Sequence, residues 1–266
     1  MERRKFLASS VAAVAASTTL HTSQTQAQES AAPAEREYYD LRAYHVRGGP
    51  QKMLADSYFR DALIPALNRQ GIKPVGAFNT SIGEGGSSSM YLLLPSTKAE
   101  TLLGVEARLA GDTEYQKAGA AFINAPAREP GFMSVESTLI YAFQAFPKLT
   151  TMPTDAPRLF EMRTYESPTF QDHYRKIEQM NTGEGPIFKK AGFQIIFMGD
   201  RVIGGRIPSL TYMIGFATLA DRDKAWSTFF GSPEWKTLSA DPRYSFEPLV
   251  SNIDNAILAP TAYSQI

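Results

Sequence analysis

Cysteine is missing from this 266-residue sequence. Its absence excludes disulfides, thiolate metal sites, iron–sulfur clusters, a cysteine nucleophile and a lipid-modified cysteine. Histidine is scarce, with only His21, His45 and His173, and no two of them have the local spacing of a metal site. These shortages argue against a zinc or non-haem iron centre. We therefore expect no metal and no cofactor, although a haem held by one axial histidine stays open.

The sequence also lacks an excess of either positive or negative charge. Lysine plus arginine and aspartate plus glutamate number 27 each, so the formal net charge is zero. A balanced chain has no general electrostatic attraction for nucleic acid. No stretch approaches the roughly 20 apolar residues that span a bilayer. We therefore expect no nucleic-acid partner and no stable membrane insertion.

The N-terminal segment has the pattern of an export signal. Arg3 and Arg4 precede a weakly apolar stretch that ends near Leu20, and small residues follow up to Ala27. The arginine pair resembles a twin-arginine signal, while the general secretory route stays open. We predict a signal peptide at 1–27, cleaved near Ala27, and a periplasmic or secreted mature protein. A disordered lead-in is expected at 28–36 because it has no apolar period.

The remaining sequence is one unit that occurs twice. Matching segments recur at an offset of 120 or 121 residues: 38–44 with 159–165, 70–72 with 191–193, 90–93 with 211–214, and 114–117 with 234–237. A segment rich in proline and threonine, 147–157, has the composition of a linker. We therefore divide the chain into a first domain at 37–146, the linker at 147–157, and a second domain at 158–266.

Both copies contain the same order of expected elements. The strands are expected at 37–45, 75–81, 90–94 and 135–143 in the first copy, and at 158–166, 194–198, 210–216 and 251–258 in the second. A helix separates the first and second strands, and another separates the third and fourth. This order is typical of a ferredoxin-like domain, whose sheet leaves one face uncovered. We predict an α+β fold in which two tandem ferredoxin-like domains pack sheet to sheet as a pseudo-two-fold α/β barrel.

The opening strands resemble those of a known family. Tyr39-Asp40-Leu41-Arg42-Ala43-Tyr44 and Phe160-Glu161-Met162-Arg163-Thr164-Tyr165 are similar to the aromatic-acid-apolar-Arg-x-Tyr opening of NIPSNAP domains. The helix break Gly231-Ser232-Pro233-Glu234-Trp235 has the same resemblance, whereas the first copy has Asp112-Thr113 where the family often has proline. The resemblance implies the dimeric α/β-barrel superfamily. Its members range from monooxygenases and haem enzymes to proteins without known catalysis.

Alternation along the opening strands collects polar side chains on one face. The candidate site residues are Asp40, Arg42 and Tyr44 in the first copy, and Glu161, Arg163 and Tyr165 in the second. We expect the helices to cover the apolar face and the polar set to face the space between the sheets. There the arginines would hold an anion and the tyrosines would donate hydrogen bonds. The alternative is a buried network that satisfies itself and binds nothing.

His45 follows the first strand and is expected near the mouth of the barrel, as a general base, a metal ligand or simply a loop residue. Three functions stay open. The first is a barrel that encloses a small organic, in particular anionic, ligand, with cofactor-free oxidation or proton transfer as chemistry that the resemblance permits. The second is a non-catalytic structural or interaction module, and the third is a haem-type enzyme. Uncovered sheet edges would allow a homo-oligomer.

Overall fold

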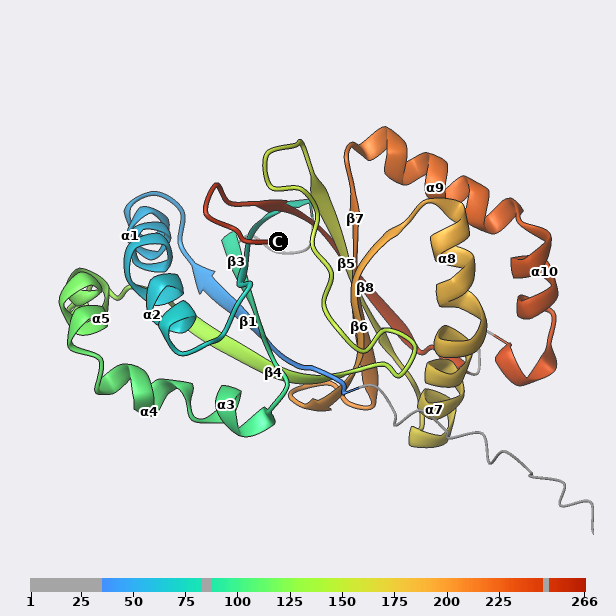
Figure 1. Cartoon of the computed structure of the whole chain (residues 1–266), viewed down its shortest axis with the longest axis horizontal. Helices are drawn as coiled ribbons and strands as arrows, with labels where there is room; N and C mark the ends of the chain where they lie inside the picture. Colours follow the sequence, from blue (N-terminus) through green and yellow to red (C-terminus); the bar gives the residue numbers. More distant parts are fainter. Residues whose placement is uncertain (1–34, 83–87, 246–248) are drawn as a thin grey trace, which may run out of the picture. The chain divides into compact units, whose positions relative to one another are not determined.

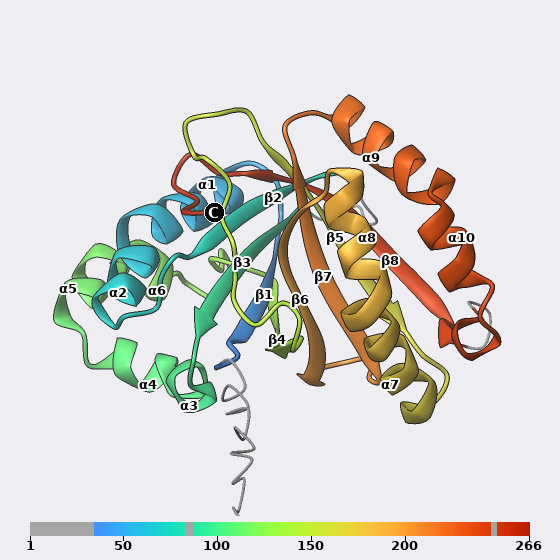
Figure 2. The same ribbon diagram turned by 45° about the vertical axis from the view of Figure 1, so that its right-hand side comes forward.

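The computed structural model describes residues 35–82, 88–245 and 249–266. These residues belong to one compact unit, a closed barrel with helices outside it (Figure 1 and Figure 2). The predicted signal peptide at 1–27 and most of the lead-in at 28–36 lie outside the described residues. In the described part of the chain, no helix is long and apolar enough to cross a membrane.

The first repeat contributes four strands and its own helical layer. Its strands are β1 (Tyr38–Val46), β2 (Gly76–Ile82), β3 (Ser88–Ser96) and β4 (Ser134–Ala142). Its helices are α1 (Pro50–Tyr58), the π-helical turn η1 (Phe59–Leu63), α2 (Ile64–Arg69), α3 (Ala99–Leu103), α4 (Val105–Ala110), α5 (Thr113–Ala118) and α6 (Ala120–Ile123).

The second repeat has the same order. Its strands are β5 (Leu159–Glu166), β6 (Gln194–Ile203), β7 (Ser209–Phe216) and β8 (Asn252–Pro260). Its helices are α7 (Phe170–Gln179), the π-helical turn η2 (Met180–Glu184), α8 (Gly185–Ala191), α9 (Leu219–Gly231), α10 (Pro233–Ser239) and the 3-10 turn η3 (Pro242–Tyr244).

Capping residues fix where the helices begin and end. The side chains of Thr169 and Thr218 accept hydrogen bonds from backbone N–H groups in the first turns of α7 and α9. Gly71 and Gly192 follow α2 and α8 with φ of 80° and 95°. This left-handed conformation favours glycine, which explains why glycine follows both helices.

Eight strands close the barrel in the order β1-β3-β2-β8-β5-β7-β6-β4. Within each repeat this is the ferredoxin-like order, and the ladders β2–β8 and β4–β6 join the two sheets. The predicted fold is therefore confirmed. The expected uncovered sheet edges are wrong for the described strands, because each edge strand of one repeat pairs with an edge strand of the other.

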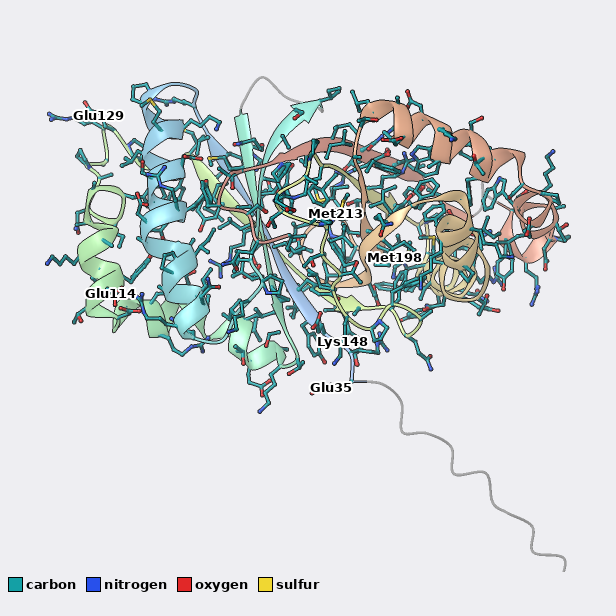
Figure 3. The ribbon with its side chains drawn as sticks, turned by 45° about the horizontal axis from the view of Figure 1, so that its top comes forward. Glu35, Glu114, Glu129, Lys148, Met198 and Met213 are labelled. Carbon is teal, nitrogen blue, oxygen red and sulfur yellow. The ribbon has the colours of Figure 1, made fainter. Side chains whose placement is uncertain are left out.

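The buried side chains form three clusters. One lies under the helices of each repeat, and the third fills the barrel interior. Figure 3 shows Met213, a member of the interior cluster, in the middle of the molecule, whereas Glu114 lies at its margin. Tyr39 and Leu41 of β1 belong to the interior cluster, while Tyr44 belongs to the cluster under the first-repeat helices.

The expected direction of the polar stripe is thus wrong. Asp40, Arg42 and Tyr44 line a pocket that is shared with α3–α6, and the contacts of Glu161 run to α9. The physical reason is that the helices supply partners for these side chains. An eight-stranded barrel interior is narrow, and here apolar side chains fill most of it.

Candidate functional site

A pocket of about 540 Å³ lies between the sheet and the helices of the first repeat. Aromatic and aliphatic side chains make most of its wall: Tyr44, Tyr58, Leu102, Leu103, Val105, Tyr115, Phe122, Ile123, Phe132, Val135 and Leu139. A polar edge is made by Asp40, Arg42, Glu106 and Ser137. A concave apolar site with a few polar groups on one side is the usual form of a small-molecule site.

Arg42 is the centre of the polar edge. Its Nε donates to Oδ2 of Asp40 at 2.7 Å, and its Nη1 donates to Oε1 of Glu106 at 2.6 Å. Ser137 donates to the other Asp40 oxygen at 2.6 Å. Burial alone would lower the pKa of Arg42, but Asp40 and Tyr44 outweigh it, so its pKa is raised. One guanidinium therefore holds two carboxylates, and these three groups carry a net negative charge.

Three tyrosines supply hydroxyl groups to the same pocket. The hydroxyls of Tyr58 and Tyr115 lie 2.6 Å apart. Burial raises the pKa of Tyr44, Tyr58 and Tyr115. These phenols consequently stay protonated at neutral pH, where they can donate hydrogen bonds but cannot act as bases.

The second repeat places a fuller network at the equivalent position. Glu161 is completely buried and accepts from Arg163 at 2.9 Å, from two nitrogens of Arg222 at 2.7 and 3.0 Å, and from the Trp226 indole at 2.8 Å. Burial would raise the pKa of Glu161, but these donors lower it overall. Arg163 continues the network to Tyr165 at 3.2 Å.

One residue position on a helix explains why the two repeats differ in the space beside the arginine. The indole of Trp226 covers the Glu161–Arg163 pair, and the Arg163 guanidinium lies 5.0 Å from the indole centre. At the repeat offsets of 121 and 120 residues, the first-repeat equivalents of Trp226 are Val105 and Glu106. Neither has the volume of an indole. The first repeat therefore keeps open space beside its arginine where the second repeat places an aromatic ring.

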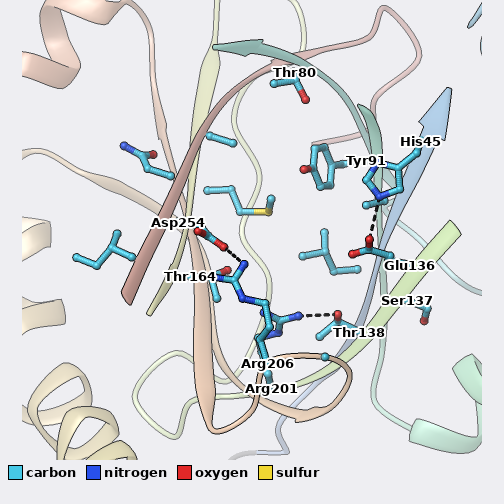
Figure 4. Close-up of a pocket in the computed structure, with 17 residues that line it drawn as sticks. His45, Thr80, Tyr91, Glu136, Ser137, Thr138, Thr164, Arg201, Arg206 and Asp254 are labelled. Carbon is cyan, nitrogen blue, oxygen red and sulfur yellow. Dashed lines mark hydrogen bonds and ion pairs between the residues drawn. The ribbon is translucent and has the colours of Figure 1, made fainter. Parts of the chain in front are cut away.

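A second pocket, of about 460 Å³, lies in the barrel interior (Figure 4). His45 lies here: its Nδ1 is 3.1 Å from the Ser89 hydroxyl and its Nε2 is 3.1 Å from Glu136. Arg201 of β6 reaches the same pocket and donates from Nη2 to the Thr138 hydroxyl at 3.0 Å. His45 is therefore separated from the other predicted site residues, which lie on the helix side of the sheets.

The structure thus divides the predicted set into three places. It brings Asp40, Arg42 and Tyr44 together in the first-repeat pocket, and it brings the second-repeat trio together in the Glu161 network. It does not bring the two trios to a common site.

Sequence reasoning missed several residues of these sites: Tyr58, Glu106, Tyr115, Arg201, Arg222 and Trp226. The sequence predicts a loop at 199–209, so Arg201 was not a candidate. In the structure, strand β6 extends to Ile203 and includes this residue. Helical spacing indicates that Tyr58 faces the sheet, but it does not predict that the Tyr58 hydroxyl meets the hydroxyl of Tyr115.

Two further buried polar pairs lie under α7. Lys176 donates to Glu184 at 2.6 Å and to Gln179 at 2.7 Å. His173 is 2% exposed, and its Nε2 lies 2.8 Å from Asp200. These contacts give both α7 side chains a partner inside the protein, although Nδ1 of His173 has none among the described residues. Among the described residues, no group of three or more His, Cys, Asp or Glu side chains could hold a metal ion.

Comparisons with known proteins match the second repeat to a protein family and the barrel to solved structures. Residues 160–265 match the family model described as NIPSNAP, which places a NIPSNAP domain in the second repeat. No match to a curated protein is found.

Three solved structures illustrate the likeness. A "putative monooxygenase" from Fusobacterium nucleatum is 8% identical over 85% of this chain and 93% of its own, with a TM-score of 0.58. Another protein so described, from Lactobacillus acidophilus, is 8% identical over 85% of this chain and 94% of its own, with a TM-score of 0.55. A NIPSNAP-like domain protein from Burkholderia xenovorans is 20% identical over 40% of this chain and 88% of its own, with a TM-score of 0.36. At these identities the first two likenesses show the fold alone.

Proposed function

We propose that the first repeat binds a small, flat, neutral aromatic molecule in its helix–sheet pocket. The single observation that carries this proposal is the open space beside Arg42, bounded by aromatic rings and three tyrosine hydroxyls. A volume of about 540 Å³ accommodates a bicyclic or tricyclic molecule. The matching offset between the repeats also supports the inference that the first repeat is a diverged copy of the NIPSNAP domain.

The charge of the polar edge selects a neutral ligand. Arg42 already binds Asp40 and Glu106, so a ligand carboxylate would meet more negative than positive charge. A ligand hydroxyl, in contrast, can donate to Glu106, whose side chain is 68% exposed. The anion-holding role expected for Arg42 is therefore replaced by a role in positioning two acceptors.

The same arrangement limits the chemistry of the pocket. Arg42 stabilises the ionised form of Glu106, which makes that carboxylate a weak base, and the net negative edge disfavours a phenolate. We therefore propose ligand binding, with Glu106 as hydrogen-bond acceptor, as the minimal function of the pocket. Proton transfer and cofactor-free oxidation would need a stronger base than Glu106 provides.

The proposal is tested by filling the pocket. Val135 of β4 lines it and is 37% exposed, so Val135→Trp places a ring in open space instead of in packed core. Val202→Trp is the matched control, because Val202 is a strand valine with 39% exposure that lines neither pocket described above. We expect 2-naphthol to bind the wild type and the control, and to bind Val135→Trp at least tenfold more weakly by fluorescence titration.

The neutral preference is tested with 2-naphthoate, which should bind this pocket at least tenfold more weakly than 2-naphthol. The alternative function, a non-catalytic structural or interaction module, predicts that neither probe binds. Equal binding of 2-naphthol to all three proteins would contradict the proposed site. Circular dichroism is used to verify that the Val135→Trp protein is folded before its binding is compared.

A further inference from the structure

Arg201 lines the barrel interior and has no carboxylate in contact among the described residues. Its Nε is buried and has no hydrogen-bond partner, and its Nη2 donates only to the neutral hydroxyl of Thr138. Within the described residues, no carboxylate forms an ion pair with it. Arg42 and Arg163, by comparison, each contact a carboxylate at 2.6–2.9 Å. The residue as a whole is partly exposed, but a guanidinium Nε that is shielded from solvent and unpaired is costly, so an anion placed beside it would stabilise it.

The acidic residues around this pocket are engaged elsewhere. Asp254 pairs with Arg206, and Glu136 lies 3.1 Å from His45 (Figure 4). Glu166, outside the pocket lining, also pairs with Arg206. Burial lowers the pKa of Arg201, and repulsion from Arg206 adds to the effect, although the three carboxylates oppose it from a distance. The two arginines and two carboxylates that line the pocket therefore balance in charge, but neither Glu136 nor Asp254 forms an ion pair with the Arg201 guanidinium.

The side chains that line the pocket around Arg201 indicate the chemistry of the rest of the ligand. Leu41, Ala43 and Met162 provide an apolar surface, and Tyr91 and Thr164 add hydroxyl groups. A volume of about 460 Å³ holds an organic molecule larger than a simple inorganic anion. Arg206 and Asn255, which are exposed, mark the side where solvent reaches the pocket.

We propose that the barrel interior is a second binding site, for a small organic carboxylate. Its carboxylate pairs with the Arg201 guanidinium, which offers the fork of donors that suits a planar anion. Its hydrocarbon part lies against Leu41 and Met162. This site differs from the first-repeat pocket in position, in charge and in ligand class, and it does not depend on the proposed function of that pocket.

The experiment uses 4-fluorobenzoate as the probe, with binding followed by fluorine NMR titration of the whole protein. Arg201→Gln removes the charge, and Ala43→Met narrows the pocket without changing any charge. Arg158→Gln is the matched control: Arg158 is a half-buried arginine whose donors go to the backbone carbonyls of Thr154, Ser264 and Ile266, outside this pocket. We expect the dissociation constant to rise at least tenfold in the first two variants and less than threefold in the control.

The other outcomes separate this proposal from simpler explanations. If inorganic phosphate competes with the probe and Ala43→Met changes nothing, the site takes any small anion and the organic-carboxylate assignment is overturned. If the wild type does not bind 4-fluorobenzoate, the proposal fails as well. Titration of the same variants with 2-naphthol distinguishes this failure from that of the first-repeat pocket, because both Arg201→Gln and Ala43→Met should bind 2-naphthol like the wild type. That titration also shows that the variants are folded.

Discussion

Three arginines show how partners decide the role of one residue type. Arg42 holds two carboxylates and Arg163 shares Glu161 with Arg222, whereas Arg201 has no carboxylate in contact in the part of the chain that the structure describes. The sequence singled out the first two because they repeat beside an acid and a tyrosine. The acids of the same repeated pattern, Asp40 and Glu161, are the ion-pair partners of these two arginines. The most regular pattern in the sequence therefore identified arginines whose charge is already neutralised.

Glu161 offers a direct test of the second-repeat network. Its pKa in the folded protein is below the ordinary value of 4.5, so its stabilising contribution is complete above that pH and is lost as the pH falls through the folded-state pKa. We expect Glu161→Gln to lower the free energy of unfolding at pH 7 by about 3 kcal/mol, since it leaves two guanidinium groups without a counter-charge. The difference between wild type and variant should narrow below pH 4.5 in urea titrations.

The control for this prediction is Glu234→Gln. Glu234 is an exposed surface residue that pairs with Lys190, and its pKa is also lowered. An exposed pair contributes little to stability. A Glu161→Gln effect no larger than that of Glu234→Gln, or one that is independent of pH, would show that the network does not stabilise the fold.

At the scale of elements, the sequence predicted the strands and their order but missed the π-helical turns. Strand alternation and the capping residues depend on neighbouring positions, which a sequence shows directly. The turns η1 and η2 span Phe59–Leu63 and Met180–Glu184, at the same offset of 121 residues as the opening strands. Each inserts one residue into an otherwise continuous helix, so α1 runs on into α2 and α7 into α8. Such insertions depend on tertiary packing and often occur at functional sites.

The helix-ending glycines give an element-scale prediction. Gly192 has φ of 95° and free space around the position of an added Cβ, so Gly192→Ala changes backbone strain and not packing. We expect it to destabilise the protein by about 1 kcal/mol in urea unfolding. Gly231→Ala is the matched control, because Gly231 also has free space but is the last residue of helix α9 and has no positive φ. Its stability should be unchanged or raised; equal losses in both would refute the capping argument.

At the scale of the whole molecule, duplication predicted the barrel but not the side of the sheet that the polar stripe faces. Both faces of each sheet are buried, one under helices and one in the barrel, so alternation separates the two faces without saying which is which. The deciding contacts come from residues far along the chain: Glu106 lies 64 residues from Arg42, and Arg222 lies 61 from Glu161. A single sequence does not show such pairings.

Export remains a prediction of the N-terminal sequence. We expect the full chain, expressed in a bacterium with both export routes, to yield a periplasmic protein that starts near residue 28. Changing Arg3 and Arg4 to lysine should leave unprocessed protein in the cytoplasm, measured by fractionation and N-terminal mass spectrometry. The matched control changes Arg36 and Arg47, which lie outside the signal, to lysine. Unchanged processing of the first variant would favour the general secretory route, and a cytoplasmic wild type would contradict export.

The last residues of the second repeat bind the two halves into one barrel. The backbone N–H groups of Thr261 and Gln265 donate to the carbonyls of Ala77 in β2 and of Val75 just before it. The N–H groups of Ala77 and Val75 donate in turn to the side chains of Ser264 and Gln265. Ile266 is fully buried in the interior cluster. Removing that side chain leaves a cavity where strands of both repeats meet. We expect Ile266→Ala to destabilise the protein by about 2–5 kcal/mol, with a single cooperative transition in which both halves unfold together. Ile82→Ala, at a 60% exposed position of β2, should have little effect. Two separate transitions in the wild type would mean that each repeat folds independently of barrel closure.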